Sequence, residues 1–100
     1  MTGVRWSLHA REDLERLRVF LSVNNARAAR AAVELLLAST APLAEFPLRG
    51  RLLSDDEPEY REFLVPFSNS GYVVLYRIND DHIEVQAVKH MREAGYRPPT

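Results

Sequence analysis

The pattern of hydrophobic and polar positions begins with an alternation typical of a β-strand. Val4, Trp6 and Leu8 are apolar and are separated by polar residues, which predicts a short strand over residues 4–8 with one apolar face. Over residues 10–21 the apolar positions recur every three or four residues, which is the spacing of an amphipathic helix. Ser7 precedes this helix and belongs to a residue type that caps helix N-termini.

A second helix is predicted over residues 26–45, after a break at Asn24 and Asn25. Its apolar stripe consists of Ala29, Val33, Leu36, Thr40 and Leu43. Pro42 conflicts with a continuous helix because proline has no amide hydrogen, so we expect a kink or a separate final turn there. Because only a short turn joins the two helices, they are predicted to form an antiparallel hairpin.

Residues 46–59 show neither period and form the longest predicted loop, which contains two prolines and a glycine. Three strands are predicted to follow, over residues 60–67, 72–78 and 82–89, separated by short turn-forming segments. The order of elements is therefore β-α-α-β-β-β. Helices and strands grouped in this way predict an α+β fold, in which the helical hairpin packs on one face of a small antiparallel sheet.

Length and composition narrow the classes of protein to consider. One hundred residues support one hydrophobic core, so residues 1–100 are expected to form a single domain. No apolar run approaches the roughly 20 residues that span a bilayer, and charged residues interrupt the N-terminal stretch where a signal peptide would lie. The chain contains no cysteine, which excludes disulfides and zinc–thiolate sites. We therefore expect a cytoplasmic protein that does not bind membranes.

Charge and histidine content limit the candidate chemistry further. The formal net charge is −1, from 13 cationic and 14 acidic residues. Proteins that bind nucleic acid usually gain affinity from an excess of Lys and Arg, so such a role here would require the cations to gather on one surface. His9, His82 and His90 are scattered along the chain, so no metal site is expected, and no motif indicates a cofactor.

Short motifs follow one another in a characteristic order: Val4-Arg5-Trp6, Phe46-Pro47, Gly50-Arg51, Tyr60-Arg61-Glu62-Phe63, residues 71–78 and residues 88–96. In this order they resemble the RelE/ParE toxin superfamily, and the likeness covers nearly the whole chain. The resemblance implies the toxin of a type II toxin–antitoxin pair, neutralised by a cognate antitoxin protein. RelE-like members cleave mRNA on the ribosome with the 2′-hydroxyl of the message as nucleophile, whereas ParE-like members poison DNA gyrase.

RNA cleavage by this route requires a base, a cation that stabilises the charged phosphorane, and an acid. His90 is the candidate acid or base, and Arg61 and Arg77 are the candidate phosphate clamps, because all three lie near strand ends that could converge. Further candidate contacts to the target or to phosphate are Arg92, Tyr96 and Arg51. The alternative for each residue is a structural role in surface ion pairs or hydrogen bonds. If the chain is an enzyme, we expect a metal-independent endoribonuclease.

The charge balance favours one of the two activities. Ribosome-entering nucleases of this superfamily tend to be strongly basic, whereas this chain is slightly acidic. We therefore expect a ParE-like toxin that poisons DNA gyrase, with RelE-like cleavage of mRNA as the alternative. A non-toxic protein-interaction module is a further alternative, and normal growth after expression without a partner would favour it.

An antitoxin-binding surface is predicted from apolar residues in excess of those that a small core requires. Val19, Phe20 and Val23 lie off the main stripe of the first helix, and Tyr72 and Tyr76 add aromatic area to the sheet. We expect an extended or helical segment of the antitoxin to cover these five residues in a hetero-oligomer. The alternative is that they complete the hydrophobic core.

Overall fold

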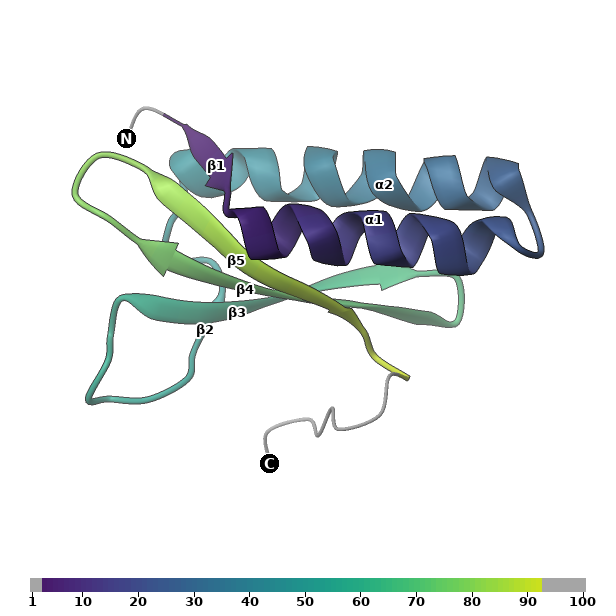
Figure 1. Cartoon of the computed structure of the whole chain (residues 1–100). Coiled ribbons are helices and arrows are strands. Elements are labelled where there is room, and N and C mark those ends of the chain that lie inside the picture. The colour runs from purple at the N-terminus through teal and green to yellow at the C-terminus, as the bar shows by residue number, and fades with distance from the viewer. Residues whose placement is uncertain (1–2, 93–100) are drawn as a thin grey trace.

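The computed structural model describes residues 3–92 and consists of two layers, a helical hairpin and a five-stranded sheet (Figure 1). Helices α1 (Leu8–Ser22) and α2 (Ala26–Thr40) form the hairpin, and a 3-10 turn, η1 (Ala41–Ala44), follows them. The strands are β1 (Val4–Trp6), β2 (Arg51–Leu52), β3 (Tyr60–Phe67), β4 (Ser70–Ile78) and β5 (Ile83–His90). The predicted α+β fold, with the hairpin on one face of a small sheet, is confirmed.

Both helices begin after capping residues of the kind that the sequence predicts. The Ser7 hydroxyl accepts a hydrogen bond from the Ala10 amide at 3.1 Å. The Asn25 side-chain oxygen accepts from the amides of Arg27 and Ala28 at 3.0 and 3.1 Å. These bonds satisfy N–H groups that the first turn of a helix leaves unpaired.

Two predicted boundaries are wrong by a few residues. Because Ser7 caps α1, the strand β1 ends at Trp6, and Leu8 is a helical residue that is 65% exposed rather than part of the apolar face of the strand. Helix α2 ends at Thr40 and does not continue to residue 45. Pro42 lies in the separate turn η1, as expected from its missing amide hydrogen.

The strands are ordered β1-β5-β4-β3-β2. The meander of β3, β4 and β5 is antiparallel as predicted. By contrast, β1 pairs in parallel with the first half of β5, from Val4 opposite Ile83 to Trp6 opposite Val85, so the sheet is mixed. The sequence pattern also missed β2, which adds two residues to the outer edge of β3. As a result, β5 lies between β1 and β4, and α1 packs against it.

The hydrophobic core lies between the hairpin and the sheet. Its buried members are Ala10, Leu17, Ala32, Leu36, Val65, Tyr72, Val74, Val85 and Val88. A second buried cluster, beside η1, consists of Leu43, Tyr76 and Ile83. The predicted role of Tyr72 and Tyr76 in an antitoxin-binding surface is wrong, because both side chains are completely buried and complete the core.

The Tyr76 hydroxyl anchors the loop between η1 and β2. It donates to the Pro47 carbonyl at 2.7 Å and accepts from the Gly50 amide at 2.8 Å. The Arg61 guanidinium donates to the carbonyls of Gly50 and Leu48 at 2.8 and 3.3 Å. A Cβ at residue 50 would lie 2.6 Å from the Tyr76 hydroxyl, so the close approach requires glycine. Burial raises the pKa of Tyr76, which keeps this hydroxyl protonated.

The change Tyr76→Phe is expected to lower the free energy of unfolding by about 1–3 kcal/mol, because it leaves the Pro47 carbonyl and the Gly50 amide without a partner. Tyr72→Phe is the matched control. The Tyr72 hydroxyl is buried but has no hydrogen-bond partner within residues 3–92, so its removal is expected to be neutral or slightly stabilising. Urea unfolding followed by circular dichroism measures both changes. Equal losses in the two variants would contradict the anchoring role of Tyr76.

Candidate functional site

The three predicted catalytic residues lie at opposite ends of the sheet. Arg61 lies near the beginning of β3, and Arg77 lies near the end of the adjacent antiparallel β4, so both are at one end. His90 ends β5 and pairs with Tyr72, at the beginning of β4. Arg77 lies opposite Glu84, and His90 is six positions further along β5, a separation of about 20 Å at the rise of a strand. The predicted convergence of Arg61, Arg77 and His90 is therefore wrong.

The arginines at the far end of the sheet make structural contacts. Arg77 donates to the side-chain oxygen of Asn79, and its guanidinium lies over the Tyr60 ring, 5.8 Å from the ring centroid. Arg51, a predicted contact to the target, forms an ion pair with Glu62 at 2.9 Å. Arg61 also donates hydrogen bonds to loop carbonyls. All three arginines therefore make structural contacts of the kind considered above as the alternative to phosphate binding.

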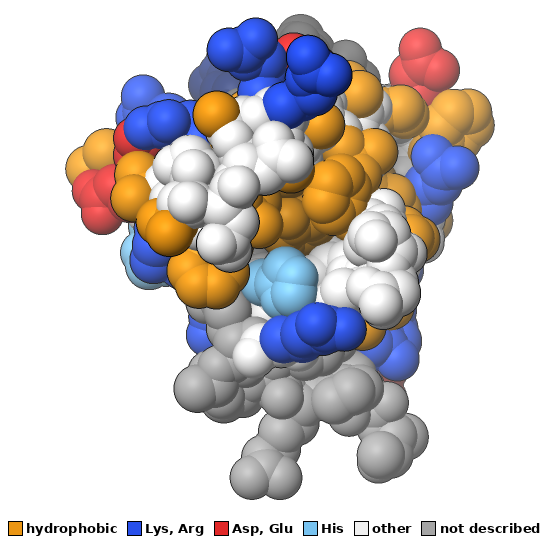
Figure 2. Space-filling model, turned by 90° about the vertical axis from the view of Figure 1, so that its right-hand side faces the viewer, with side chains coloured by type: hydrophobic (Ala, Val, Ile, Leu, Met, Phe, Trp, Pro, Cys, Tyr) orange, Lys and Arg blue, Asp and Glu red, His pale blue; other side chains and the backbone are white. Residues whose placement is uncertain are grey.

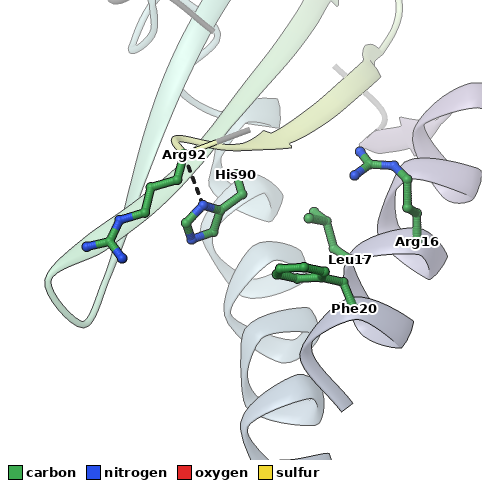
Figure 3. Close-up of a pocket in the computed structure, with 5 residues that line it drawn as sticks. All are labelled: Arg16, Leu17, Phe20, His90 and Arg92. Carbon is green, nitrogen blue, oxygen red and sulfur yellow. Dashed lines mark hydrogen bonds between the residues drawn. The ribbon is translucent and has the colours of Figure 1, made fainter. Parts of the chain in front are cut away.

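A hollow of about 590 Å³ opens at the other end, between α1 and the end of β5 (Figure 2). Its lining residues are Arg16, Leu17, Phe20, His90 and Arg92. Leu17 and Phe20 point from α1 toward the imidazole of His90, and Arg92 extends on the other side of that ring (Figure 3). The hollow therefore combines an apolar wall with two guanidinium groups and one imidazole. Tyr96, the remaining predicted contact, lies outside the described residues.

Two contacts orient the His90 side chain. The backbone amide of Arg92 donates to Nδ1 at 3.0 Å, so the proton of the neutral ring is on Nε2. The ring of buried Tyr72 meets the imidazole edge to face, with 5.3 Å between centroids and 84° between planes. Because Tyr72 is fixed in the core, this packing holds His90 in the hollow. An ordered imidazole in a hollow that two arginines also line favours an anionic partner.

Exposed apolar side chains lie on the second half of α1 and at its C-cap, Val23, and one of them, Phe20, lines the hollow. Val19, Phe20 and Val23 are 50%, 66% and 80% exposed. Figure 2 displays hydrophobic side chains on this face around the hollow. Neighbouring exposed apolar groups of this kind are typical of protein-binding surfaces.

Charge is segregated along the molecule. Residues 16–33, around the turn of the hairpin, contain four arginines and no acidic residue, and Lys89 and Arg92 lie at the same end as the hollow. The acidic residues of the loop over residues 55–59 and of the turn at residues 80–81 lie at the opposite end, on the left of Figure 1. The net charge of −1 therefore averages over two ends of different charge, although Arg16 and Arg18 at the hairpin end are paired with Asp13 and Glu15.

Arg16 is the residue of the hollow that sequence reasoning missed. Arg16 lies outside the apolar positions of the first helix, Ala10, Leu14, Leu17 and Leu21, and arginines at such positions are ordinary surface residues. One available signal was its spacing, because Arg16, Leu17 and Phe20 lie on adjoining positions of one helical face. The sequence pattern carries no information on which strand end this face meets, so it could not predict that Arg16 and His90 line the same hollow.

Two further classes of site can be assessed for the part of the chain that the structure describes. Within residues 3–92, no group of three His, Cys, Asp or Glu side chains is placed to hold a metal ion. None of the helices in this range is long and apolar enough to cross a membrane. The polar groups that the hollow offers to a ligand are guanidinium and imidazole groups.

Comparison with known proteins gives consistent matches over most of the chain. Residues 4–95 match the family described as ParE toxin of the type II toxin-antitoxin system parDE. Toxin RelE1 of Caulobacter vibrioides is 37% identical over 84 residues, which cover 84% of this chain and 87% of the relative. Toxin RelE3 of the same organism is 33% identical over 93 residues, which cover 93% and 98%.

Two solved structures share the fold. The chromosomal ParDE TA system from P. aeruginosa contains a chain that superposes with a TM-score of 0.70 at 18% identity, covering 90% of this chain and 96% of that one. The toxin-antitoxin complex RelBE2 from Mycobacterium tuberculosis contains one with a TM-score of 0.54 at 27% identity, covering 89% and 96%. On the match over residues 4–95 and the two curated relatives, the chain belongs to the ParE toxin family within the RelE/ParE superfamily and is the toxin of a type II toxin–antitoxin system.

Proposed function

We propose that this toxin inhibits growth by poisoning DNA gyrase in the cytoplasm. The observation that carries the proposal is the separation of Arg61 and Arg77 from His90, which gives no support to a nuclease centre built from these three residues. The exposed apolar residues of α1, beside the arginines of the hairpin end, suit contact with a large protein target. The match of residues 4–95 to the ParE family supports the same target.

Cleavage of mRNA on the ribosome is the second candidate, and the composition of the hollow favours it. His90 offers an acid or base, while Arg16 and Arg92 offer cations for the scissile phosphate. Both curated relatives are named RelE toxins. In this mechanism the clamps would differ from the predicted ones, since Arg61 and Arg77 would take no part in the chemistry.

Parallel assays of the purified toxin distinguish the two targets. We expect gyrase-linked DNA breaks in a supercoiling reaction and no cuts in mRNA on programmed ribosomes. His90→Ala is tested beside Arg77→Ala, a control at the far end of the sheet. Codon-positioned cuts without DNA breaks, reduced by about 10²–10⁴-fold in His90→Ala and unchanged in Arg77→Ala, would contradict the gyrase proposal and support the second candidate.

The antitoxin, in this proposal, covers the hairpin end and forms a hetero-oligomer with the toxin. The similar structures come from a ParDE system and from a RelBE2 toxin–antitoxin complex, which supports a partner of this class. Val19, Phe20 and Val23 offer exposed apolar area. Since residues 16–33 carry four arginines and no acid, the segment that binds here is expected to be acidic as well as apolar.

Phe20→Ala is expected to weaken antitoxin binding by about tenfold or more, because an exposed aromatic side chain beside a hollow is a typical binding anchor. The free energy of unfolding is expected to change by less than about 0.5 kcal/mol. Phe46→Ala is the matched control, since Phe46 is 58% exposed and lies in the loop that Tyr76 anchors. Isothermal titration calorimetry with the cognate antitoxin measures the affinity of both variants. Equal affinities for the two variants would contradict the proposed surface.

A further inference from the structure

The edge of β5 that faces away from β4 pairs with another strand along only half of its length. Its first half pairs with β1, and the Ser7 amide extends this pairing by donating to the Val85 carbonyl at 2.9 Å. Beyond this point the chain has turned into α1, so no strand within residues 3–92 continues the ladder on that side. Backbone groups of a buried strand edge need other partners. Side chains of α1 supply them at Val88.

Asp13 makes the central contact between this edge and α1. Its side chain is almost entirely buried, and Oδ2 accepts a hydrogen bond from the Val88 amide at 3.0 Å. Oδ1 lies 3.6 Å from the Arg16 guanidinium, which also donates to the Val88 carbonyl at 3.4 Å. His9 Nε2 lies 3.5 Å from Oδ2. One carboxylate therefore joins the helix to the strand and to a cation of the hollow.

We infer that Asp13 is a positioning residue, which fixes the Arg16 guanidinium and the end of β5 relative to each other at the rim of the hollow. Arg16 lines the hollow directly, and Val88 precedes His90 by two residues on the same strand. Asp13 itself is too deeply buried to serve as a main contact for a partner. An effect of Asp13 on antitoxin binding rests on the proposed antitoxin surface. The contact by which Asp13 positions Arg16 does not depend on that proposal.

Removing the charge of Asp13 distinguishes a role in positioning Arg16 from a role that is limited to capping the edge of β5. An asparagine has the same shape and an oxygen that accepts from the Val88 amide, so it preserves the cap. It has no charge to hold Arg16. A neutral acceptor would also be less costly to bury than a carboxylate, unless the nearby cations compensate the charge. If capping were the whole role, Asp13→Asn would leave Arg16 unaffected.

The test is NMR on the ¹⁵N-labelled full chain, comparing wild type, Asp13→Asn and Glu12→Gln. Glu12 is the exposed neighbour, so its substitution matches the change in net charge. In Asp13→Asn we expect protection of the Val88 amide to fall by no more than about fivefold, because the asparagine oxygen keeps the cap, while the Nε–H order of Arg16 falls to that of a solvent-exposed arginine. Glu12→Gln is expected to change neither. An Arg16 side chain equally ordered in Asp13→Asn and wild type would overturn the inference.

Arg16→Gln gives a second measurement that does not require Asp13→Asn to fold. It removes the cation that Asp13 shares with the Val88 carbonyl, so protection of the Val88 amide is expected to fall by about fivefold. Unchanged protection would overturn the coupling of Asp13, Arg16 and Val88.

The antitoxin affinity of these variants tests the positioning role of Asp13 separately from the proposed antitoxin surface. Asp13→Asn and Arg16→Gln are each expected to weaken binding about fivefold, and the double variant no more than the weaker-binding single one, because both changes remove the same held cation. Fully additive losses would overturn the positioning role. Two results together would support the positioning role and contradict the antitoxin surface. The first is a loss of Arg16 side-chain order in Asp13→Asn, and the second is an Arg16→Gln variant that binds the antitoxin as tightly as wild type.

Discussion

The placement of α1 along β5 determines the arrangement of the rest of the molecule. Ser7 is the single residue between β1 and α1, and its backbone amide is bonded to β5. Because β1 runs parallel to β5, α1 begins beside the middle of β5 and runs toward its end. This register brings Leu17 and Phe20 beside His90 and places Asp13 opposite the Val88 amide. The hollow is therefore a consequence of a three-residue strand and one capping serine.

The elements that depend on local physics were accessible from the sequence. Helical periodicity, the caps at Ser7 and Asn25, and the break at Pro42 are all properties of neighbouring residues, and the structure has each of them. The parallel pairing of β1 with β5 joins residues about eighty positions apart, and no local pattern encodes it. The two-residue strand β2 is too short to carry a period.

The candidate site was predicted less well, for reasons that differ between residues. His90 was predicted from its chemical type and its place at a strand end, and it lines the hollow. The prediction that Arg61 and Arg77 lie near His90 was wrong. Strand direction alone excludes this arrangement, because successive antiparallel strands finish at opposite ends of the sheet. For Tyr72, aromatic composition does not distinguish core from surface. Only the register, which places it opposite Val65 on the face that the helices cover, decides its burial.

The net charge says little about the target because it averages over two ends of the molecule. The chain measures 39 Å along its longest axis, whereas charges in a solution of physiological ionic strength are screened over about 8–10 Å. A partner at the hairpin end therefore interacts electrostatically with the arginines there and only weakly with the acidic loop at the far end. A low net charge therefore does not exclude contact between nucleic acid and the hairpin end.

We propose that this toxin binds its antitoxin at the hairpin end, around the hollow. Hydrogen exchange measured by mass spectrometry, on the toxin alone and in complex with its antitoxin, tests it most directly. New protection is expected over residues 16–23 and 88–92, with exchange over residues 53–59 and 79–82 unchanged. Protection confined to the acidic end, with the hairpin end unaltered, would contradict it.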